Sequence, residues 1–563
     1  MMQKTFLFFC WLLLCNTLLA QTPAKYWVQF SDKAHSPYSI QEPEKYLSMR
    51  AIERRQRMHI SITEQDLPVN QQYIDSLYLI DTTMVLLTTS KWFNAVTIYT
   101  ETDSILGKSI VEKIKELPFV KYVECTALPK QPEKFNYPRV HYQPPKTTKE
   151  VFSCNDIDYG NSFYQVALNG GNWLHQLGVC GEGMRIAVFD AGFENVNTLP
   201  QFSALRDEGR LLGARNFVQP GRSVFISGSH GTNTLSCIVG YEKGVIVGTA
   251  PKASIYLAVT EDSRSENKVE EDNWVAAAEW ADSLGCDVIS SSLGYHRFDI
   301  KNQSYIYQDM NGEVSRASIA ASIAATKGML VCVSAGNEGN KSWKYLTAPA
   351  DARGILTVGA VTYDRQPASF SSIGPTSDGR VKPEALAVGV NAIVVQPSGY
   401  VSDASGTSFA APLLCGMATC LWQLFPSLSN DVIIKGICFA GSHTNAPTPK
   451  YGYGIPNMMK ASNLLAQYAE HDLTISSQLY YKKKTAKLVY TSQSEHPDFD
   501  ITISLRNGQI FSTKHYHLKK NQGTISVPLP PLPKDVAYEI AILQITNHNS
   551  QTSFPYYIGL IYK

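Results

Sequence analysis

The sequence lacks several features that mark specialised classes of protein. It has 11 cysteines but no Cys-x-x-Cys pair and no zinc-site spacing, which excludes a cysteine-based zinc module. The formal net charge is only +1 and no strongly charged tail occurs, so nothing indicates a nucleic-acid partner. Internal repeats are absent. The composition that remains, 44% hydrophobic and 18% charged over 563 residues, is typical of a globular protein with about three to four domains.

Long apolar runs are also missing, with one exception at the N-terminus. Residues 1–20 contain one lysine and an apolar run that ends at Ala20, which is the pattern of a cleaved secretory signal peptide. A membrane anchor is the alternative, but the run is short and Asn16 interrupts it; Cys15 does not follow a small residue, which disfavours a lipoprotein anchor. No later segment has the about 18 apolar residues of a membrane span. We expect an exported protein, either secreted or held at the cell surface.

Nine cysteines remain after the expected cleavage, and an odd number leaves at least one free thiol. Most stand in apolar runs, as Cys332 does in "MLVCVSAG" and Cys415 does in "PLLCG", which favours small buried side chains. Export permits disulfides without proving any, so the pairing stays open.

The pattern of apolar residues divides the exported chain into three folded units. Residues 21–125 alternate strand-like and helix-like runs, which predicts a small α+β unit, and the Pro-, Lys- and Thr-rich residues 126–150 predict an extended linker. Residues 151–468 alternate continuous apolar runs with Ala-rich helical patterns, which predicts an α/β unit with a mostly parallel sheet and helices on both faces. Residues 469–563 predict a small β-sandwich. The strands expected in the α/β unit are "MRIAVFD", "ASIYLAV", "CDVISSSLG", "MLVCVSAG" and "ILTVGAV".

Three polar residues stand where an α/β fold places its chemistry, at strand ends and helix starts. Asp190 directly follows a buried strand, His230 begins a helical stretch, and Ser408 begins another. Taken singly, each has a structural alternative: a turn aspartate, a cap or surface histidine, and an N-cap serine. Because proline is tolerated in a helix only within the first turn, Pro412 predicts that this helix starts close to Ser408. A hydroxyl there also lies near free backbone N–H groups that can hold a developing oxyanion.

The order of Asp190, His230 and Ser408 is that of the subtilisin type of catalytic triad. The segments "IAVFDAGF", "SHGTNTLSCIVG", "DVISSSLGY", "VSAGNEG" and "GTSFAAP" follow one another in the same order as in the subtilases. On these segments, over roughly residues 155–460, the sequence resembles the subtilisin-like serine peptidases. The resemblance implies a subtilisin-like fold and a serine endopeptidase that acts on polypeptides through an acyl-enzyme.

The resemblance also implies a role for each matching residue. Ser408 would attack the scissile carbonyl, His230 would take its proton, and Asp190 would fix the tautomer of His230. Asn337 would donate to the oxyanion beside the backbone N–H of Ser408, with a turn asparagine as the structural alternative. The segment Ser292, Leu293 and Gly294 would line the substrate and pair with an extended peptide.

Some positions depart from the family pattern or leave a feature open. Ala191 stands after the aspartate, where many members carry a serine or threonine that can hydrogen-bond the carboxylate. Pro349 lies near a position where the family often has a cis proline, and either isomer is open here. The acidic stretch 261–272 could favour basic substrates, but a solvated loop face is the preferred interpretation. No cofactor is expected; a structural calcium ion is left open, because "DMNGE" at 309–313 is too generic to localise one.

The flanking units also resemble parts of subtilase zymogens. The N-terminal unit has the size and the strand and helix order of the ferredoxin-like prodomain, which implies a folding chaperone and inhibitor that the enzyme removes itself. A permanent accessory domain is the alternative. The C-terminal β-unit weakly resembles the sorting domains of type IX secreted proteins, which would place a contact with the export machinery there; a plain binding or stabilising domain is equally consistent.

Two other functions remain as alternatives to a secreted zymogen peptidase. A catalytically silent subtilase that serves as a binding protein would keep the fold without the reaction. A serine hydrolase acting on esters is disfavoured, because the G-x-S-x-G elbow is absent around Ser408 and the order of the triad differs. The natural substrate, its preferred residue at the cleaved bond and the processing site are not readable from the sequence.

Overall fold

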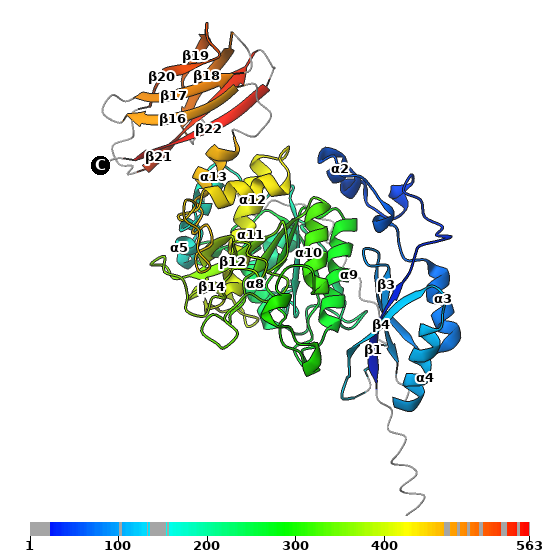
Figure 1. The fold of residues 1–563 in the computed structure, drawn as a ribbon. Helices are drawn as coiled ribbons and strands as arrows, with labels where there is room; N and C mark the ends of the chain where they lie inside the picture. The colour runs from blue at the N-terminus through cyan, green and yellow to red at the C-terminus, as the bar shows by residue number, and fades with distance from the viewer. Residues whose placement is uncertain are drawn as a thin grey trace, which may run out of the picture.

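The computed structural model describes residues 23–100, 104–131, 133–135, 154, 157–466, 473–480, 485–492, 496–505, 510–530, 538–548 and 552–561. The expected signal peptide and most of the expected linker lie outside these residues. A small N-terminal unit, a large central α/β unit and a β-rich C-terminal unit follow one another along the chain (Figure 1).

The N-terminal unit is a four-stranded antiparallel sheet with the strand order β2-β3-β1-β4. Its strands are β1 (Ala24–Phe30), β2 (Val85–Ser90), β3 (Ala95–Thr100) and β4 (Val120–Ala127), and its helices are α2 (Met49–Arg57), α3 (Gln71–Ile80) and α4 (Ser104–Lys115). This is the ferredoxin-like arrangement expected from the resemblance. Helix α3 was not predicted; it begins after Asn70, whose side-chain oxygen accepts from the backbone N–H of Gln72 at 3.0 Å.

The central unit contains a seven-stranded sheet in which every neighbouring pair is parallel, with the order β13-β12-β11-β10-β5-β9-β6. Its strands are β5 (Arg185–Asp190), β6 (Leu211–Asn216), β9 (Ser254–Val259), β10 (Val288–Ser291), β11 (Leu330–Ser334), β12 (Leu356–Val361) and β13 (Ala385–Val388). The five strands predicted from apolar runs are confirmed as β5, β9, β10, β11 and β12.

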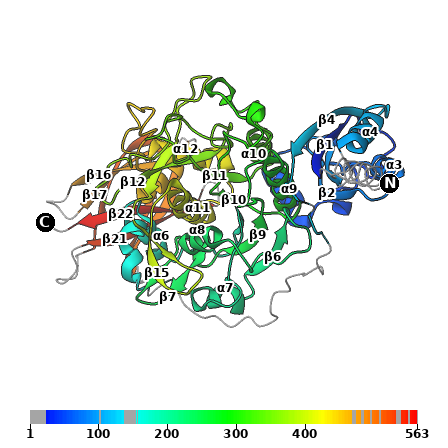
Figure 2. The same cartoon turned by 90° about the horizontal axis from the view of Figure 1, so that it is seen from below.

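Helices cover both faces of this sheet, which explains the continuous apolar runs (Figure 2). Along β5, Ile186 and Val188 pack in one core with α8 (Ser229–Val239) and α11 (Thr407–Leu424). The alternate residues Ala187 and Phe189 pack on the other face with α9 (Val269–Ser283) and α10 (Arg316–Thr326). The expected subtilisin-like fold is thus confirmed. The other α-helices and strands described in this unit are α5 (Phe163–Ala167), α6 (Gly171–Gln176), α7 (Ser203–Asp207), α12 (Asn430–Phe439), α13 (Met458–Leu465), β7 (Tyr241–Glu242), β8 (Ile246–Val247), β14 (Ala392–Val395) and β15 (Val401–Ala404).

Helix α11 runs through the central unit. Among the described residues it is the one helix long and apolar enough to cross a membrane, but 89% of it is buried inside the protein. We therefore interpret α11 as a core helix of the central unit.

The C-terminal unit consists of two antiparallel sheets, β16-β17-β20 and β19-β18-β21-β22. The strands are β16 (Leu473–Tyr480), β17 (Thr485–Ser492), β18 (Asp498–Leu505), β19 (Ile510–His517), β20 (Gln522–Pro528), β21 (Tyr538–Asn547) and β22 (Thr552–Ile561). Leu488 and Val527 from the first sheet share one buried core with Ile501 and Ile545 from the second. The unit is therefore a β-sandwich, as predicted.

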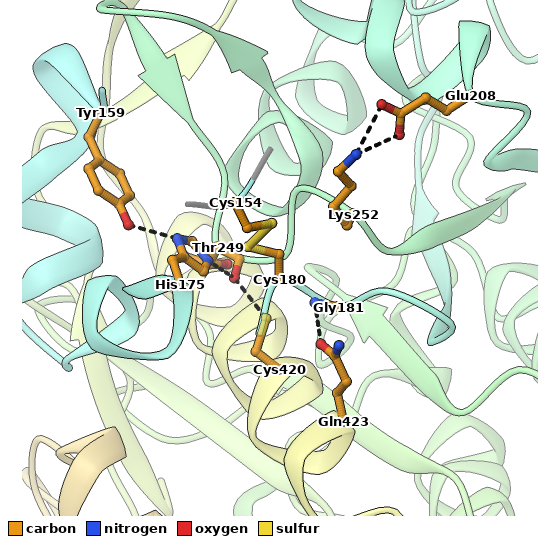
Figure 3. The surroundings of a disulfide bond; sticks show 10 residues. All are labelled: Cys154, Tyr159, His175, Cys180, Gly181, Glu208, Thr249, Lys252, Cys420 and Gln423. Atoms are coloured by element: carbon orange, nitrogen blue, oxygen red, sulfur yellow. Dashed lines mark hydrogen bonds and ion pairs between the residues drawn. A yellow bond between two sulfur atoms is a disulfide. The ribbon is translucent and has the colours of Figure 1, made fainter. Parts of the chain in front are cut away.

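One disulfide, which the sequence left open, joins Cys154 to Cys180 just before β5 (Figure 3).

Nearby, the ring of His175 lies between the hydroxyl of Tyr159, 2.8 Å from Nδ1, and the carbonyl oxygen of Thr249, 2.9 Å from Nε2. Burial lowers the pKa of His175 to about 4, so the ring is neutral. A carbonyl oxygen only accepts, so Nε2 carries the hydrogen and Nδ1 accepts from Tyr159. Among the residues that the structure describes, the free cysteines are Cys125, which is half-buried, and Cys237, Cys286, Cys332, Cys415, Cys420 and Cys438, which are buried.

Candidate active site

Asp190, His230 and Ser408 come from three different elements of the central unit. Asp190 is the last residue of β5, and His230 and Ser408 are the second residues of α8 and α11. Helix α8 approaches the strand closely: a Cβ atom at Gly231 would lie 2.1 Å from the carbonyl oxygen of Gly192 and 2.9 Å from Cβ of Asp190. Glycine at position 231 therefore lets His230 reach the carboxylate.

His230 is held by Asp190 through a single ring nitrogen. Its Nδ1 lies 2.8 Å from Oδ1 and 3.0 Å from Oδ2 of Asp190. An ionised carboxylate only accepts, so Nδ1 carries the hydrogen and the lone pair of the neutral ring is on Nε2. Burial acts to lower the pKa of His230, but the charge of Asp190 and the hydrogen bond to it raise this pKa, and the net shift is upward. The His230 side chain is 39% exposed, so Nε2 is accessible to a proton donor.

Two further donors complete the surroundings of Asp190, which is fully buried. The backbone N–H of Ala191 donates to Oδ1 at 2.8 Å, and the hydroxyl of Thr234 donates to Oδ2 at 3.0 Å. Thr234 lies four residues after His230, on the same face of α8. It supplies the hydroxyl that Ala191 cannot, and sequence reasoning missed it. The signal was available in the spacing, because "SHGTNT" places a hydroxyl one helical turn after the histidine.

Ser408 lies in the first turn of α11 but does not cap it. The helix begins at Thr407, its N-cap is Gly406, and no side chain caps it. The hydroxyl of Ser408 instead points toward the carbonyl oxygen of Ser292, 3.5 Å away, at the end of β10. The expected start of the helix is confirmed, and the capping alternative is wrong.

The prediction that Pro412 lies in the first turn is also wrong, since it is the sixth residue of α11. Proline has no N–H to donate to the carbonyl oxygen of Ser408, four residues earlier. That oxygen accepts from the hydroxyl of Ser292 at 2.8 Å instead. A side chain from β10 thus replaces the missing helical hydrogen bond and allows the proline deeper in the helix.

Asn337 lies in the loop after β11, and its amide is oriented by Thr407. The oxygen Oδ1 accepts from the backbone N–H of Thr407 at 2.9 Å and from its hydroxyl at 3.0 Å. Because both donors face Oδ1, the amide Nδ2 group is the free donor, and it lies on the side of Gly406. Thr407 was not singled out in the sequence. Its role depends on a contact between distant segments that spacing does not reveal.

The expected substrate segment directly follows β10. Ser292 is buried, Leu293 is half-buried and Gly294 is exposed. Tyr295, the next residue, forms an antiparallel bridge with Ala348, and the peptide bond between Ala348 and Pro349 is cis. Pairing of this segment with a peptide stays a prediction.

The acidic stretch 261–272 is not a solvated loop face, and this expectation is corrected. Helix α9 begins at Val269, and Glu270, Glu271 and Asp272 in its first turn are buried. They lie at the positive end of the helix dipole, and Glu270 accepts from the backbone N–H of Asn267 at 3.0 Å. Burial raises the pKa of Glu261 to about 8.

The N-terminal unit packs on α9 and α10 of the central unit (Figures 1 and 2). Glu124 on β4 pairs with Lys268 at 3.0 Å and also with Arg316. Glu279 on α9 accepts from the backbone N–H groups of Lys91 at 2.6 Å and Trp92 at 3.0 Å. The two units therefore share buried polar contacts.

Comparison with known proteins identifies two of the three units of the chain. Residues 181–454 match the subtilase family, and residues 25–138 match the peptidase S8 propeptide domain of Bacteroidota. A thermostable alkaline protease of Halalkalibacterium halodurans is 26% identical over 63% of this chain and 81% of its own length. Subtilisin NAT of Bacillus subtilis subsp. natto is 29% identical over 51% of this chain and 68% of its own, and subtilisin Savinase of Lederbergia lenta is 28% identical over 51% and 94%. Residues 181–454 are therefore a peptidase domain of the subtilase family, preceded by an S8 propeptide domain, and the protein is a serine endopeptidase.

Proposed function

We propose that this serine endopeptidase cleaves peptide bonds with Ser408 as nucleophile, His230 as base and Asp190 as the residue that orients His230. The observation that carries the proposal is the contact of Nδ1 of His230 with both oxygens of Asp190, which leaves Nε2 as the base. The Ser408 oxygen bonds to the scissile carbon while its proton passes to Nε2, which then gives it to the leaving amine. Water hydrolyses the acyl-enzyme by the same route.

The negative charge that develops on the carbonyl oxygen has two donors available. One is the backbone N–H of Ser408 in the first turn of α11, and the other is Nδ2 of Asn337. Removal of one such donor typically costs about 2.7–4 kcal/mol of transition-state stabilisation. Because Thr407 fixes the amide orientation of Asn337, this donor is ready before the substrate binds. Residues Ser292 to Gly294 would hold the peptide by backbone pairing.

The enzyme would be made as an exported zymogen. The N-terminal pattern of residues 1–20 supports secretion or display at the cell surface, and the propeptide match supports an inhibitor carried in the same chain. The buried contacts of Glu124 and Glu279 would hold the N-terminal unit on the peptidase after the chain is cut between them. The C-terminal sandwich stays a candidate for contact with the export machinery.

The proposal is tested with the full chain and its Ser408→Ala variant. Both are incubated with a fluorophosphonate probe, and the intact mass of each is followed. Wild type should gain one probe and lose about 100 residues beyond the signal peptide, while the variant does neither. If wild type remains unlabelled after a second protease has removed the N-terminal unit, the triad is not assembled and the chain is a silent binding protein.

A further inference from the structure

The outer face of the C-terminal sandwich gathers histidines and aspartates from three neighbouring segments. Asp500 on β18 lies directly opposite His515 on β19, and Asp498 lies opposite His517. On the other side of β18, the backbone N–H of His548 donates to the carbonyl oxygen of Asp498 at 2.8 Å, which continues the register of β21. The residues between them, such as Phe499 and Tyr516, are buried in the core, so alternation turns the polar set outward.

Three of these side chains converge on one point. Oδ1 of Asp500 lies 2.8 Å from Nδ1 of His515, and Oδ2 lies 3.0 Å from Nε2 of His548. The two imidazole rings are 5.5 Å apart between centroids. One ligand atom from each of the three residues lies within 4.8 Å of the other two. A tetrahedral ion with bonds of about 2.0–2.1 Å holds its ligands about 3.3 Å apart, so small rotations of these side chains would suffice.

The second nitrogen of His515 also faces a carboxylate. Its Nε2 lies 3.0 Å from Oδ1 of Asp498. A neutral imidazole has one N–H and one lone pair, so one of its two nitrogens must set a lone pair against a carboxylate. That repulsion disappears if a cation lies between the lone pair and Asp500. If Nε2 carries the hydrogen, on the side of Asp498, Nδ1 points its lone pair at Asp500, as in the carboxylate–histidine–metal arrangement.

We propose that Asp500, His515 and His548 bind one divalent transition-metal ion of the zinc type, with Asp498 as the outer partner that orients His515. Two imidazoles and one carboxylate suit Zn²⁺, whereas Ca²⁺ and Mg²⁺ prefer all-oxygen sites. A water molecule would take the fourth coordination position of the ion, because His515 and His548 are exposed to solvent. The ion would link β18, β19 and the end of β21. It would stabilise the sandwich by mass action, because the unfolded chain does not bring the three ligands together.

The test uses the untagged full chain with Ser408→Ala, so that neither a histidine tag nor self-cleavage interferes. The chain is treated with a chelator, dialysed and titrated with Zn²⁺ by calorimetry, and thermal unfolding is followed with and without the ion. We expect one equivalent to bind and the melting temperature of the sandwich to rise. His515→Ala and His548→Ala should each weaken binding about tenfold or more. His517→Ala, on the same strand but outside the ligand set, should bind as the parent does.

Several results would overturn the proposal. If Zn²⁺ neither binds nor raises the melting temperature of the parent, the cluster is only a hydrogen-bonded histidine–aspartate network. If His517→Ala weakens binding as much as His515→Ala does, this ligand set is wrong. Asp500→Asn keeps the size of the side chain and serves as the second variant where a histidine variant fails to fold. If the proposal is right, Asp500→Asn also binds Zn²⁺ more weakly than the parent while its far-UV circular dichroism stays unchanged.

Discussion

Thr234 provides at the active site what Ala191 lacks, namely a hydroxyl that donates to the buried carboxylate of Asp190 at 3.0 Å. Hydrogen bonds to charged groups contribute about 1.5–3 kcal/mol. Thr234→Val keeps the shape of the side chain but removes this donor, so the carboxylate and the attached His230 ring lose part of their restraint. We expect kcat to fall about tenfold or more, with a smaller change in KM. Steady-state kinetics on a peptide substrate measures the split.

Thr232→Val is the matched control on the same helix, since its hydroxyl donates to the carbonyl oxygen of Glu194 at 2.8 Å and does not touch Asp190. Its kcat should stay within about twofold of wild type, and its loss of stability should be the smaller of the two, because its acceptor is a neutral carbonyl oxygen. Equal losses of kcat in the two variants would mean that Thr234 acts through folding alone.

The pH dependence of the reaction follows from the upward shift of the pKa of His230, to which the charge and hydrogen bond of Asp190 contribute. The base is the neutral ring, so kcat/KM should fall as the pH drops through this pKa, which lies above the ordinary histidine value of about 6.5. Asp190→Asn removes the charge, so the pKa should drop and the acid limb of the profile should move to lower pH. NMR titration of His230 in the Ser408→Ala background measures both values without turnover. An unchanged His230 pKa in Asp190→Asn would contradict the assignment.

The sequence was sufficient to locate the single residues that belong to a family motif. It was insufficient to locate the residues that orient them through hydrogen bonds. Asp190, His230 and Ser408 stand at the ends of predictable elements, so their positions followed from the pattern of apolar runs. Thr407 acts on Asn337 across a contact between segments 70 residues apart in the chain. No local pattern encodes such a contact, because it exists only after the sheet has assembled.

At the scale of elements, apolar runs predicted central strands and missed peripheral ones. Strand β5 lies in the middle of the sheet and is almost entirely buried, whereas β6, at the edge, is half-buried and includes Gly213 and Arg215. Strand β13, at the other edge, is only four residues long. Strand β6 has one neighbour and less to bury, so its sequence carries a weaker signal, whereas β13 is buried but too short to form a long apolar run. Strand β19, at an edge of the sandwich, is likewise mostly exposed.

The start of helix α11 depends on a hydrogen bond from another element, and this can be tested. Ser292→Ala leaves the carbonyl oxygen of Ser408 without the donor that replaces the missing N–H of Pro412. An unsatisfied buried acceptor costs about 1–3 kcal/mol, so the free energy of unfolding should fall by about that amount. In the double variant with Pro412→Ala, the new N–H of residue 412 can donate to this oxygen, and part of the loss should return.

Chemical unfolding of the four chains in a Ser408→Ala background gives the coupling between the two positions. We expect the effect of Ser292→Ala to be smaller in the presence of Pro412→Ala. Simple additivity of the two single changes would show that the Ser292 hydroxyl does not replace the helical hydrogen bond.

At the scale of the whole molecule, a buried ionic network joins the propeptide domain to the peptidase domain. Arg54 on α2 is 1% exposed, pairs with Asp282 on α9, and donates through Nε to the carbonyl oxygen of Lys327 at 3.1 Å. Asp282 also pairs with Arg55 at 2.9 Å and Lys91 at 3.0 Å. Burial would raise the pKa of Asp282, but these three cations hold it below its ordinary value, so the carboxylate is charged in the complex. At Asp282 the peptidase thus contributes the anion and the propeptide contributes the cations, whereas the propeptide's Asp66 pairs in the opposite sense with the peptidase's Lys327 at 3.0 Å.

This division of charges predicts how tightly the N-terminal unit stays bound after the chain is cut. Removal of one partner of a buried ion pair costs about 3–5 kcal/mol, and Asp282 keeps two other cations, so the lower figure applies. In Arg54→Met the dissociation constant of the cut unit should rise about 100-fold. Activity should then appear sooner after cleavage, and the two pieces should separate on gel filtration. Arg57→Met, an exposed position on the same helix, should keep the delay of wild type. If both variants show the same delay and co-elution as wild type, the network does not hold the propeptide on the enzyme, and inhibition must depend on contacts nearer the active site.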